Sequence, residues 1–365
     1  MIVRPLTEYC TLNMGQSPDS KTYNTQGKGL PFYQGNADFG ETHPITHVWC
    51  SAPVKVAEDG DILISVRAPI GAMNMAVERC CIGRGLAALT PIRNKCSKQF
   101  LYYALQSKVD SLIAQGTGST FKAISKKVLE ATCIPAYSTI EQEQITETIG
   151  HVDNTIAARR KQLALLDQLV KSRFIELFGD PETNPKGWTR QRLDQICENL
   201  DSRRVPITST NRKAGNYPYY GASGIVDYVK DYIFDEDILL ISEDGANLVM
   251  RSTPIAFSVS GKVWVNNHAH VVRFESKATQ KYIEICFALT DISGSITGTA
   301  QPKLNQAKLN AMMFCVPPIE LQEQFATFVE QTDKSKYYSS LSFRYCQAAA
   351  NTYRQEWMTC RTSDF

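Results

Sequence analysis

The sequence lacks any long apolar segment. No apolar run reaches the roughly 18 residues that a membrane-spanning helix needs, and the N-terminus lacks the basic and then apolar layout of a secretory signal peptide. Hydrophobic residues make up 43% and charged residues 21% of the 365 positions, as in ordinary soluble proteins. We therefore expect a cytoplasmic protein with no membrane partner, long enough for two or three domains.

The sequence also lacks paired cysteines and a strong charge of either sign. Its eleven cysteines are an odd number and include no CxxC pair, which favours reduced, mostly buried thiols over disulfides or a structural zinc site. A formal net charge of +2 excludes no class of protein by itself. It means that any surface for nucleic acid must be local, because the chain as a whole is nearly neutral.

The common catalytic motifs are missing as well. There is no GxxxxGK[ST] phosphate loop, GxSxG elbow or HExxH zinc motif. DNA methylation would need an Asn/Asp-Pro-Pro-aromatic or a Pro-Cys motif, and Asn184-Pro-Lys-Gly-Trp188 has only one of the prolines in place. The adjacent carboxylates Glu243 and Asp244 favour a solvated loop over the remnant of a nuclease. We therefore predict that the chain is no enzyme, has no catalytic residue and binds no cofactor of its own.

The five histidines give only weak signs of a metal site. A proline separates His43 from His47 and disrupts the helix that their spacing would need. His268 and His270 would share one face of a strand. Hydrogen-bonded structural histidines are the simpler interpretation of both pairs, so we predict no metal.

Proline is missing from about forty residues at the centre of the chain, before a sharp stop. Apolar residues recur there at alternating steps of four and three, and eight of the ten positions in this series are apolar. The positions are 145, 149, 152, 156, 159, 163, 166, 170, 173 and 177. This spacing predicts one long helix with a coiled-coil seam over residues 138–178. The next stretch, Phe178-Gly-Asp-Pro-Glu-Thr-Asn-Pro-Lys-Gly-Trp188, ends the helix with two prolines and two glycines.

The two halves of the chain repeat one another with a period of about 180 residues. Asp61-Ile-Leu-Ile-Ser65 recurs as Asp237-Ile-Leu-Leu-Ile-Ser242, and Leu30-Pro-Phe-Tyr-Gln-Gly35 recurs as Tyr217-Pro-Tyr-Tyr-Gly221. Three further matches keep the same order along the chain. Each half is therefore predicted to be a mixed globular unit, with short strands, glycine-bearing turns and one amphipathic helix, followed by a long helix.

The register of the central seam continues in the second half. Seven of the ten counterpart positions are apolar, and the three polar ones are consecutive. These positions are 325, 329, 332, 336, 339, 343, 346, 350, 353 and 357. This predicts a second long helix, over about 319–358, that pairs with the first and has a weaker middle. The alternative is that each helix packs separately on its own globular unit.

Polar and basic residues beside glycines occupy matching places in both halves. Arginine and lysine donate to guanine and phosphate, and asparagine and glutamine bond both ways with adenine. Solvated loops explain each stretch alone, but the recurrence in both halves makes DNA binding an equal alternative. The candidates are Gln34, Asn36, Arg67, Arg84 and Lys122 in the first half, and Tyr220, Ser223, Arg251, Lys262, Asn267, His268 and Lys303 in the second.

With its repeat and central helix, the chain resembles the specificity subunit of a type I restriction–modification system. Four stretches are similar to the family's target-recognition domains: Gly29-Leu-Pro-Phe-Tyr-Gln-Gly35, Gly60-Asp-Ile-Leu-Ile-Ser-Val-Arg-Ala-Pro-Ile-Gly71, Tyr219-Tyr-Gly-Ala-Ser-Gly224 and Gly261-Lys-Val-Trp-Val-Asn-Asn-His268. The stretch Asn184-Pro-Lys-Gly-Trp188 is similar to the junction that follows the family's central helix.

The resemblance implies an α+β fold with two similar mixed α/β target-recognition domains, residues 1–137 and 181–318. Long antiparallel helices, residues 138–180 and 319–365, would separate them as a coiled-coil spacer. Each domain would bind one half of a split site in double-stranded DNA. Two modification subunits would supply S-adenosylmethionine and adenine methylation, and restriction subunits would supply ATP- and Mg-dependent cleavage.

The C-terminal segment departs from the family's pattern. Residues 337–365, with Phe343-Arg-Tyr-Cys346 and Trp357-Met-Thr-Cys360, differ from the usual second helix and indicate a diverged or truncated one. One alternative is therefore a silent or decoy specificity subunit that does not assemble. Another, from the enzyme class, is a self-contained DNA methyltransferase or nuclease.

Overall fold

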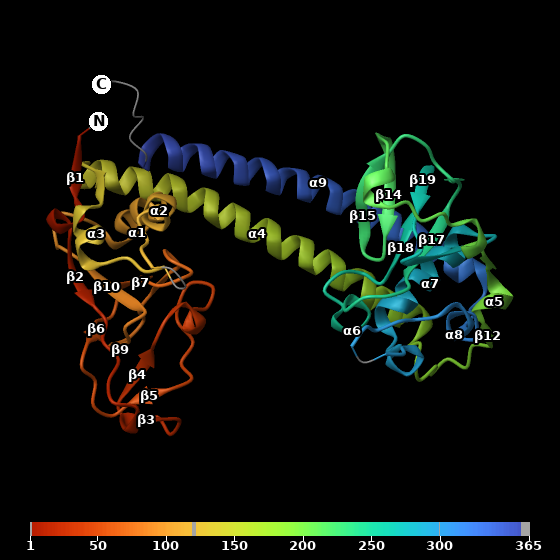
Figure 1. The fold of residues 1–365 in the computed structure, drawn as a ribbon, viewed down its shortest axis with the longest axis horizontal. Helices are drawn as coiled ribbons and strands as arrows, with labels where there is room; N and C mark the ends of the chain where they lie inside the picture. Colours follow the sequence, from red (N-terminus) through yellow and green to blue (C-terminus); the bar gives the residue numbers. More distant parts are fainter. Residues whose placement is uncertain (1, 119–121, 299, 359–365) are drawn as a thin grey trace. The chain divides into compact units, whose positions relative to one another are not determined.

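The structure is a computed structural model that describes residues 2–118, 122–298 and 300–358 (Figure 1). The chain divides into two compact units, Met1–Arg160 with Leu341–Phe365, and Lys161–Ser340. Each unit has its own hydrophobic cores. The ten described cysteines are free thiols, and seven of them are buried. Within the described residues, no helix combines the length and the apolar character that crossing a membrane requires.

The first unit contains an antiparallel four-stranded sheet, a five-stranded sheet and a separate strand pair. The four-stranded sheet has the order β2 (Cys10–Met14), β10 (Leu86–Pro91), β7 (Ile62–Ser65) and β8 (Met73–Met75). The five-stranded sheet has the order β3 (Tyr23–Asn24), β5 (Trp49–Cys50), β4 (Leu30–Tyr33), β9 (Cys80–Ile82) and β6 (Val56–Ala57). β1 (Val3–Pro5) pairs with β11 (Cys133–Pro135). Only β4 and β9 among these described neighbours run parallel.

β7 is central because its apolar residues cover both of its faces. Ile62 and Ile64 lie in the larger core of the first unit, while Leu63 lies in a smaller core on the opposite face. Successive side chains of a strand point to opposite faces, so an uninterrupted apolar run fits a strand that is covered on both sides.

Three short helices cover the larger core of the first unit: α1 (Lys98–Gln106), α2 (Val109–Ala114) and α3 (Lys126–Ala131). α1 begins at Ser97, whose hydroxyl accepts a hydrogen bond from the Phe100 amide at 3.1 Å. It buries Phe100, Leu101, Ala104 and Leu105, one helical face, in that core. In Figure 1, α1 and α3 lie beside the sheet that contains β2 and β10.

The second unit repeats this arrangement. Its antiparallel sheet has the order β13 (Glu198–Asn199), β20 (Ala269–Arg273), β17 (Ile238–Ser242) and β18 (Ala256–Val259). The other sheet has the order β15 (Gly224–Val229), β14 (Ala214–Gly221), β19 (Lys262–Val265) and β16 (Phe234–Asp235), and β12 (Arg190–Arg192) pairs with β21 (Met313–Cys315). The helices are α5 (Leu193–Ile196), α6 (Asn247–Met250), α7 (Lys277–Leu289) and α8 (Gln306–Asn310).

The correspondence between the units confirms the sequence repeat at the level of topology. β17 lies between β20 and β18 as β7 lies between β10 and β8. β14 runs parallel to β19 as β4 runs parallel to β9. The repeated strings that begin at Asp61 and Asp237 contain the two central strands, β7 and β17. The fold class expected from the sequence, α+β with two similar mixed domains and long helices, is confirmed.

Two helices of 40 residues each, α4 (Thr139–Phe178) and α9 (Ile319–Met358), contribute to both units. All ten predicted seam positions of α4 are buried or half-buried, and none is exposed. In the first unit, Asp153 forms an ion pair with Arg354 and Arg160 lies 5.9 Å from the Phe343 ring centroid. Residue numbers therefore rise along α4 as they fall along the facing part of α9. This agrees with the pairing that the seam predicted and with the antiparallel direction that the family resemblance implied.

The same pairing occurs in the second unit, where the rings of Phe174 and Phe325 lie 5.5 Å apart between centroids. Lys336, one of the three polar seam positions of α9, lies 2.8 Å from Asp167 of α4. Thr332, another of them, is buried and donates to the Phe328 carbonyl at 2.9 Å. Two of the three polar seam positions therefore have an ion-pair or hydrogen-bond partner. Near the end of α9, Tyr353 and Trp357 are exposed although the seam predicted them inside, and residues 359–365 of the C-terminal segment lie outside the described residues.

The stretch after α4 stops the helix by capping its last carbonyls. Gly179 has a φ of 79°, and its amide donates to the Ile175 carbonyl at 2.8 Å. The Lys186 ammonium donates to the carbonyls of Glu176 and Leu177 at 2.7 and 2.9 Å. The Trp188 indole donates to the Phe178 carbonyl at 2.9 Å. These side chains satisfy carbonyls that a helix end otherwise leaves without partners.

Candidate nucleic-acid interface

A pocket of about 490 Å³ lies where β4, β7 and β9 of the first unit end. Gln34 directly follows β4, Asn36 begins the short helix after it, Arg67 follows β7 and Arg84 follows β9. All four residues line the pocket. The structure therefore brings four of the five candidates of the first half to one concave surface.

Glycines allow the turns around this pocket to approach closely. A side chain at Gly85 would place its Cβ 2.3 Å from the Gln34 carbonyl oxygen, and one at Gly83 would place it 3.0 Å from the Gln34 Cα. Asp38 holds the facing turn, because its carboxylate accepts from the amides of Gln34 and Gly35 at 2.6 and 3.3 Å. The backbone around the pocket is therefore fixed without using the candidate side chains.

The cations of the first unit are available to a partner. Arg67 and Arg84 are exposed, and neither guanidinium has an ion-pair partner among the described residues. Lys122 is exposed as well, and its carbonyl accepts from the Ala68 amide at 3.0 Å, beside Arg67 in the chain. Residues 119–121, which precede Lys122, lie outside the described residues. Such side chains are the usual donors to phosphates and base edges.

Three candidates of the second unit lie on turns between strands. Ser223 lies between β14 and β15, and Asn267 and His268 lie between β19 and β20, all of them exposed. Tyr220, in β14, packs on Phe257 with the ring centroids 6.0 Å apart, and burial raises the pKa of its hydroxyl.

The same two backbone hydrogen bonds recur in each unit: one joins two turns, and the other joins the first of these turns to a third segment. In the first unit, the Val66 amide donates to the Gly85 carbonyl at 2.9 Å and the Ala68 amide donates to the Lys122 carbonyl at 3.0 Å. In the second unit, the Glu243 amide donates to the His268 carbonyl at 2.9 Å and the Gly245 amide donates to the Pro302 carbonyl at 3.0 Å. We call residues 66–68 with 83–85, and residues 243–245 with 266–268, the paired turns of the two units. Arg67 lies between the donors Val66 and Ala68, and Asp244 lies between the donors Glu243 and Gly245. Arg67 therefore corresponds to Asp244.

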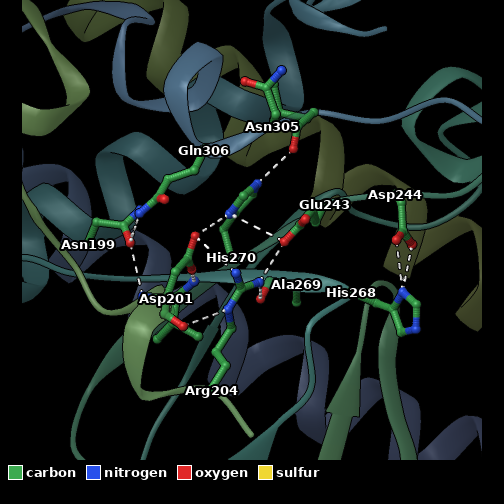
Figure 2. Close-up of polar contacts among 12 residues, drawn as sticks. Asn199, Asp201, Arg204, Glu243, Asp244, His268, Ala269, His270, Asn305 and Gln306 are labelled. Carbon is green, nitrogen blue, oxygen red and sulfur yellow. Dashed lines mark hydrogen bonds and ion pairs between the residues drawn. The ribbon is translucent and has the colours of Figure 1, made fainter. Parts of the chain in front are cut away.

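A group of charged side chains lies beneath the paired turns of the second unit (Figure 2). The Arg204 guanidinium donates to Glu243 Oε2 at 2.6 Å and lies 3.3 Å from Asp201 Oδ2. His270 Nδ1 lies 2.5 Å from Asp201 Oδ2. Asp201, Glu243 and His270 are buried, and Arg204 is half-buried. We call these four residues the charged floor.

Both ring nitrogens of His270 face oxygen atoms. Nδ1 lies against Asp201, and Nε2 lies 2.8 Å from the Leu304 carbonyl oxygen. Burial alone would raise the pKa of Asp201, but hydrogen bonds from His270 and the Val271 amide hold it below its usual value. Each carboxylate of the floor therefore has a partner in Arg204, and Asp201 has a second one in His270.

Burial likewise acts to raise the pKa of Glu243, and its partners overcome this effect. Hydrogen bonds from Arg204 and Lys303 and the charge of His270 lower the pKa of its carboxyl overall. Lys303 lies 3.1 Å from Glu243 Oε1 and is itself half exposed. On the neighbouring residue, the Asp244 carboxylate lies 2.8 Å from His268 Nδ1. The candidates Lys303 and His268 are thus tied to the acidic paired turn.

The family model for the type I restriction modification DNA specificity domain matches residues 1–168 and 185–337. The chain belongs to this family. The first matched range includes the pocket of the first unit, and the second includes the charged floor and both paired turns of the second unit. Recognition of the type I specificity family from the sequence is therefore confirmed.

Curated relatives carry names of the same kind. The type I restriction enzyme MjaIX specificity subunit of Methanocaldococcus jannaschii is 24% identical over 361 residues, with 87% of this chain and 83% of that protein covered. Two proteins with provisional names as type I specificity subunits, from Methanocaldococcus jannaschii and Haemophilus influenzae, are 40% and 32% identical over 45% and 38% of this chain. This chain spans 39% and 35% of their length.

A solved structure has the same fold. The crystal structure of the type I restriction–modification S subunit from M. genitalium aligns with a TM-score of 0.62 and covers 99% of this chain and 96% of that chain. At 16% identity, this likeness concerns the fold alone.

Two candidates in the family's second matched range have partners inside the fold. The Arg251 guanidinium donates to the carbonyls of Phe287 and Thr290 at 2.8 and 2.7 Å, at the C-terminal end of α7. Lys262 places its ammonium 4.8 Å from the Tyr232 ring centroid. Arg251 therefore caps a helix. Lys262 is exposed on β19, and its ammonium lies over the Tyr232 ring.

The sequence interpretation missed the charged floor. We expected Glu243 to lie in a solvated loop, which is wrong, because Glu243 is buried and holds two cations. Its partner Arg204 and the pair of Asp201 with His270 had no signal in the sequence, since 69 residues separate the members of that pair. A buried polar residue after an apolar strand, as in Ile241-Ser-Glu243, was the one available indication.

The expectation of structural histidines agrees with the hydrogen bonds of His43, His268 and His270, whereas His47 is exposed. His43 Nδ1 lies 3.0 Å from the Met75 carbonyl oxygen, and His268 and His270 bond to carboxylates. Over residues 2–118, 122–298 and 300–358, the structure groups no three histidine, cysteine or acidic side chains as ligands for a metal.

Proposed function

We propose that this chain is the sequence-reading subunit of a type I restriction–modification complex and that each unit binds one half of a bipartite site in double-stranded DNA. Membership of the specificity family supports the role. The observation that carries the proposal is the repetition of the paired turns. Both units present exposed polar side chains on paired turns that the same backbone hydrogen bonds hold.

The proposed division of labour follows the fold. Residues 1–137 and 181–318 serve as target-recognition domains, and residues 138–180 and 319–365 serve as the spacer. The candidate contacts in the first domain are Gln34, Asn36, Arg67, Arg84 and Lys122, and those in the second are Tyr220, Ser223, Lys262, Asn267, His268 and Lys303. Arg251 contributes indirectly, by holding the end of α7.

The chemistry is assigned to partner subunits. Two modification subunits would bring S-adenosylmethionine and methylate adenine, and restriction subunits would bring ATP, Mg and cleavage. The chain itself would act as a non-catalytic reader, which agrees with the missing catalytic motifs. Its role is then to position DNA for reactions that occur on other chains.

Selection from a random DNA library tests this role directly. The purified full chain, alone and with its modification subunits, is incubated with duplexes that carry a long randomised segment, and bound duplexes are sequenced. We expect two short specific sequences separated by a fixed number of unspecified base pairs. Enrichment of a single continuous site, or of none, would contradict the proposal.

Two assays separate the alternatives. Methylation of DNA by the chain with S-adenosylmethionine, or cleavage with magnesium, in the absence of any partner would make it a self-contained enzyme. Co-purification with modification subunits separates an active subunit from a silent or decoy one. An assembled complex that methylates the selected site supports the active role, whereas failure to assemble supports the decoy.

A length change in α4 tests the spacer. Four residues inserted within 157–162 add about 6 Å to the helix, close to two base pairs at about 3.4 Å each. The unspecified segment of the selected site is expected to grow by one or two base pairs while both specific halves stay the same. An unchanged spacing with full affinity would exclude α4 as the element that sets the distance.

A further inference from the structure

The paired turns of the two units have the same backbone but side chains of opposite chemistry. In its turn, each of Arg67 and Asp244 lies between the two residues whose amides donate the shared hydrogen bonds. Each also forms an isolated β-bridge, Arg67 with Ala123 and Asp244 with Lys303. The same position of the fold therefore carries a guanidinium in one unit and a carboxylate in the other.

In the first unit this position offers hydrogen-bond donors alone. A guanidinium has five N–H groups and accepts no hydrogen bond. Arg67 lines the pocket together with Gln34, Asn36 and Arg84, and its side chain is exposed. Its backbone is fixed, because its carbonyl accepts from the Ser65 hydroxyl at 2.8 Å. A fixed backbone with a guanidinium that has no ion-pair partner among the described residues suits two-point bonding to a group with two neighbouring acceptors.

In the second unit the position offers acceptors. The Asp244 carboxylate receives the Nδ1 hydrogen of His268, and its side chain keeps 18% of its surface exposed. Figure 2 shows the other nitrogen of the His268 ring turned away from Asp244. The His268 side chain is 51% exposed. A carboxylate that accepts from Nδ1 leaves Nε2 of a neutral ring as a further acceptor.

The base edges of the major groove differ in the same way. Guanine presents two neighbouring acceptors, O6 and N7, and arginine is their commonest partner. Cytosine presents the N4 amino group, which donates to a carboxylate. Adenine also carries an amino group, but its adjacent N7 is an acceptor that a carboxylate would repel.

We propose that Arg67 selects a guanine in the half-site of the first unit and that Asp244, together with His268, selects a cytosine in the half-site of the second unit. The inference rests on the proposed function, since it assigns bases to the two reading surfaces. It follows from the exchange of charge at one backbone position and gives each half-site one required base.

The test uses library selection with the full-length chain and two conservative substitutions. Arg67→Gln is expected to lower the preference for guanine at one position of one half-site by about tenfold or more, and to raise that for adenine, which glutamine binds. Asp244→Asn is expected to lower the preference for cytosine at one position of the other half-site by a similar factor. Arg67→Lys should keep part of the guanine preference, because lysine donates to the same atoms.

Matched controls carry the same chemistry away from the paired turns. Arg79→Gln removes an exposed guanidinium that pairs with Glu58 at 3.2 Å, and Asp235→Asn removes an exposed carboxylate of β16. Both should leave the selected sequence unchanged. Thermal unfolding of all variants should match that of the parent chain, because the substituted side chains are exposed or nearly isosteric.

Each result has one meaning. A parent chain that selects no bipartite site overturns the proposed function and this inference together. A bipartite site that keeps its guanine and cytosine preferences in the variants overturns the inference alone. Weaker binding to all sequences alike would also overturn it, since it would make Arg67 a phosphate contact rather than a reader of bases.

Discussion

The two units hold the same paired turns on floors of opposite character. In the first unit, the residues beneath the turns are apolar: Val66 is 3% exposed and Ala87 is fully buried. In the register of the sheets these two positions correspond to Glu243 and His270. Asp201 likewise takes the place that Met14 has opposite Ala87.

Because the floors differ while the backbone hydrogen bonds agree, we infer that these hydrogen bonds, rather than the floor, fix the backbone of the turns. The hydrogen bonds of the two units agree within about 0.1 Å, from Val66 to Gly85 and from Glu243 to His268. An apolar floor stabilises by burial and tolerates changes of similar volume. A charged floor stabilises only when every member has its partner, because one unpaired buried charge is costly.

The charged floor should therefore fail when one member is removed. Asp201→Ala leaves His270 and Arg204 short of a carboxylate and should lower the free energy of unfolding of the second unit by about 3–5 kcal/mol. Amide hydrogen exchange measures this by unit: the amides of β17 and β20 should lose protection while those of β7 and β10 keep it.

Asp194→Ala is the control, since Asp194 pairs with Arg192 on the surface of the same unit. It should leave exchange in both sheets nearly unchanged. Equal loss of protection in both units after Asp201→Ala would show that the floor is not a local feature of the second unit.

The cations at the two surfaces should differ in what they stabilise. Arg84→Ala and Lys122→Ala should each weaken DNA binding, by about 1–3 kcal/mol for a base contact, or lower the salt slope by about one for a phosphate contact. Neither should change the unfolding of the first unit, because both side chains are exposed. Titrations of a selected duplex at several salt concentrations measure the effect.

Lys303→Ala is the matched change in the second unit. It should weaken DNA binding and also lower the stability of that unit slightly, since Lys303 balances the buried Glu243. The expected difference between the two units would be contradicted if Lys303→Ala left the free energy of unfolding unchanged, or if Arg84→Ala lowered it.

The two floors should also respond differently to acid. The pKa values of Asp201 and Glu243 are lowered in the folded state, so their contribution is complete above their unfolded values, near 4, and is lost as the pH falls through the folded values. Each unit of pKa lowering is worth about 1.4 kcal/mol. Between pH 5 and 3, exchange protection should therefore fall more in β17 and β20 than in β7 and β10. The same loss in all four strands would contradict this.

The smallest difference is expected between two ion pairs of the long helices. Asp153 and Arg354 of the first unit are 32% and 23% exposed, whereas Asp167 and Lys336 of the second are 67% and 26% exposed. More exposed pairs stabilise less, typically by about 0–1 kcal/mol. Thermal unfolding should show a larger decrease for Asp153→Asn than for Asp167→Asn, and the opposite order would argue against burial as the cause.

Periodic features of this fold could be predicted from the sequence. The seam of α4 was predicted position by position, because burial along a paired helix follows the spacing of apolar residues alone. The repeat singled out Gln34, Asn36, Arg67 and Arg84 in glycine-bearing stretches that recur in both halves, and the structure brings them to one pocket. That these residues bind DNA stays a prediction.

The charged floor and the role of Arg251 could not be predicted in the same way. The floor depends on contacts between distant segments, such as Arg204 with Glu243, and no spacing along the chain encodes them. Arg251 has a left-handed backbone, with a φ of 49°, that turns its guanidinium to the end of α7. In the sequence it was indistinguishable from an arginine that contacts DNA.

The capped end of α4 has a consequence for the precision of a spacer. Helix ends commonly fray by one or two residues, and each residue contributes about 1.5 Å of length. Lys186 and Trp188 hold the last carbonyls of α4, so its final turn keeps a defined end. A frayed end would change the helix length by about 1.5–3 Å, close to the rise of about 3.4 Å between neighbouring base pairs. In the proposed role of α4 as a spacer, its capped end would therefore help to distinguish sites that differ by a single base pair in spacing.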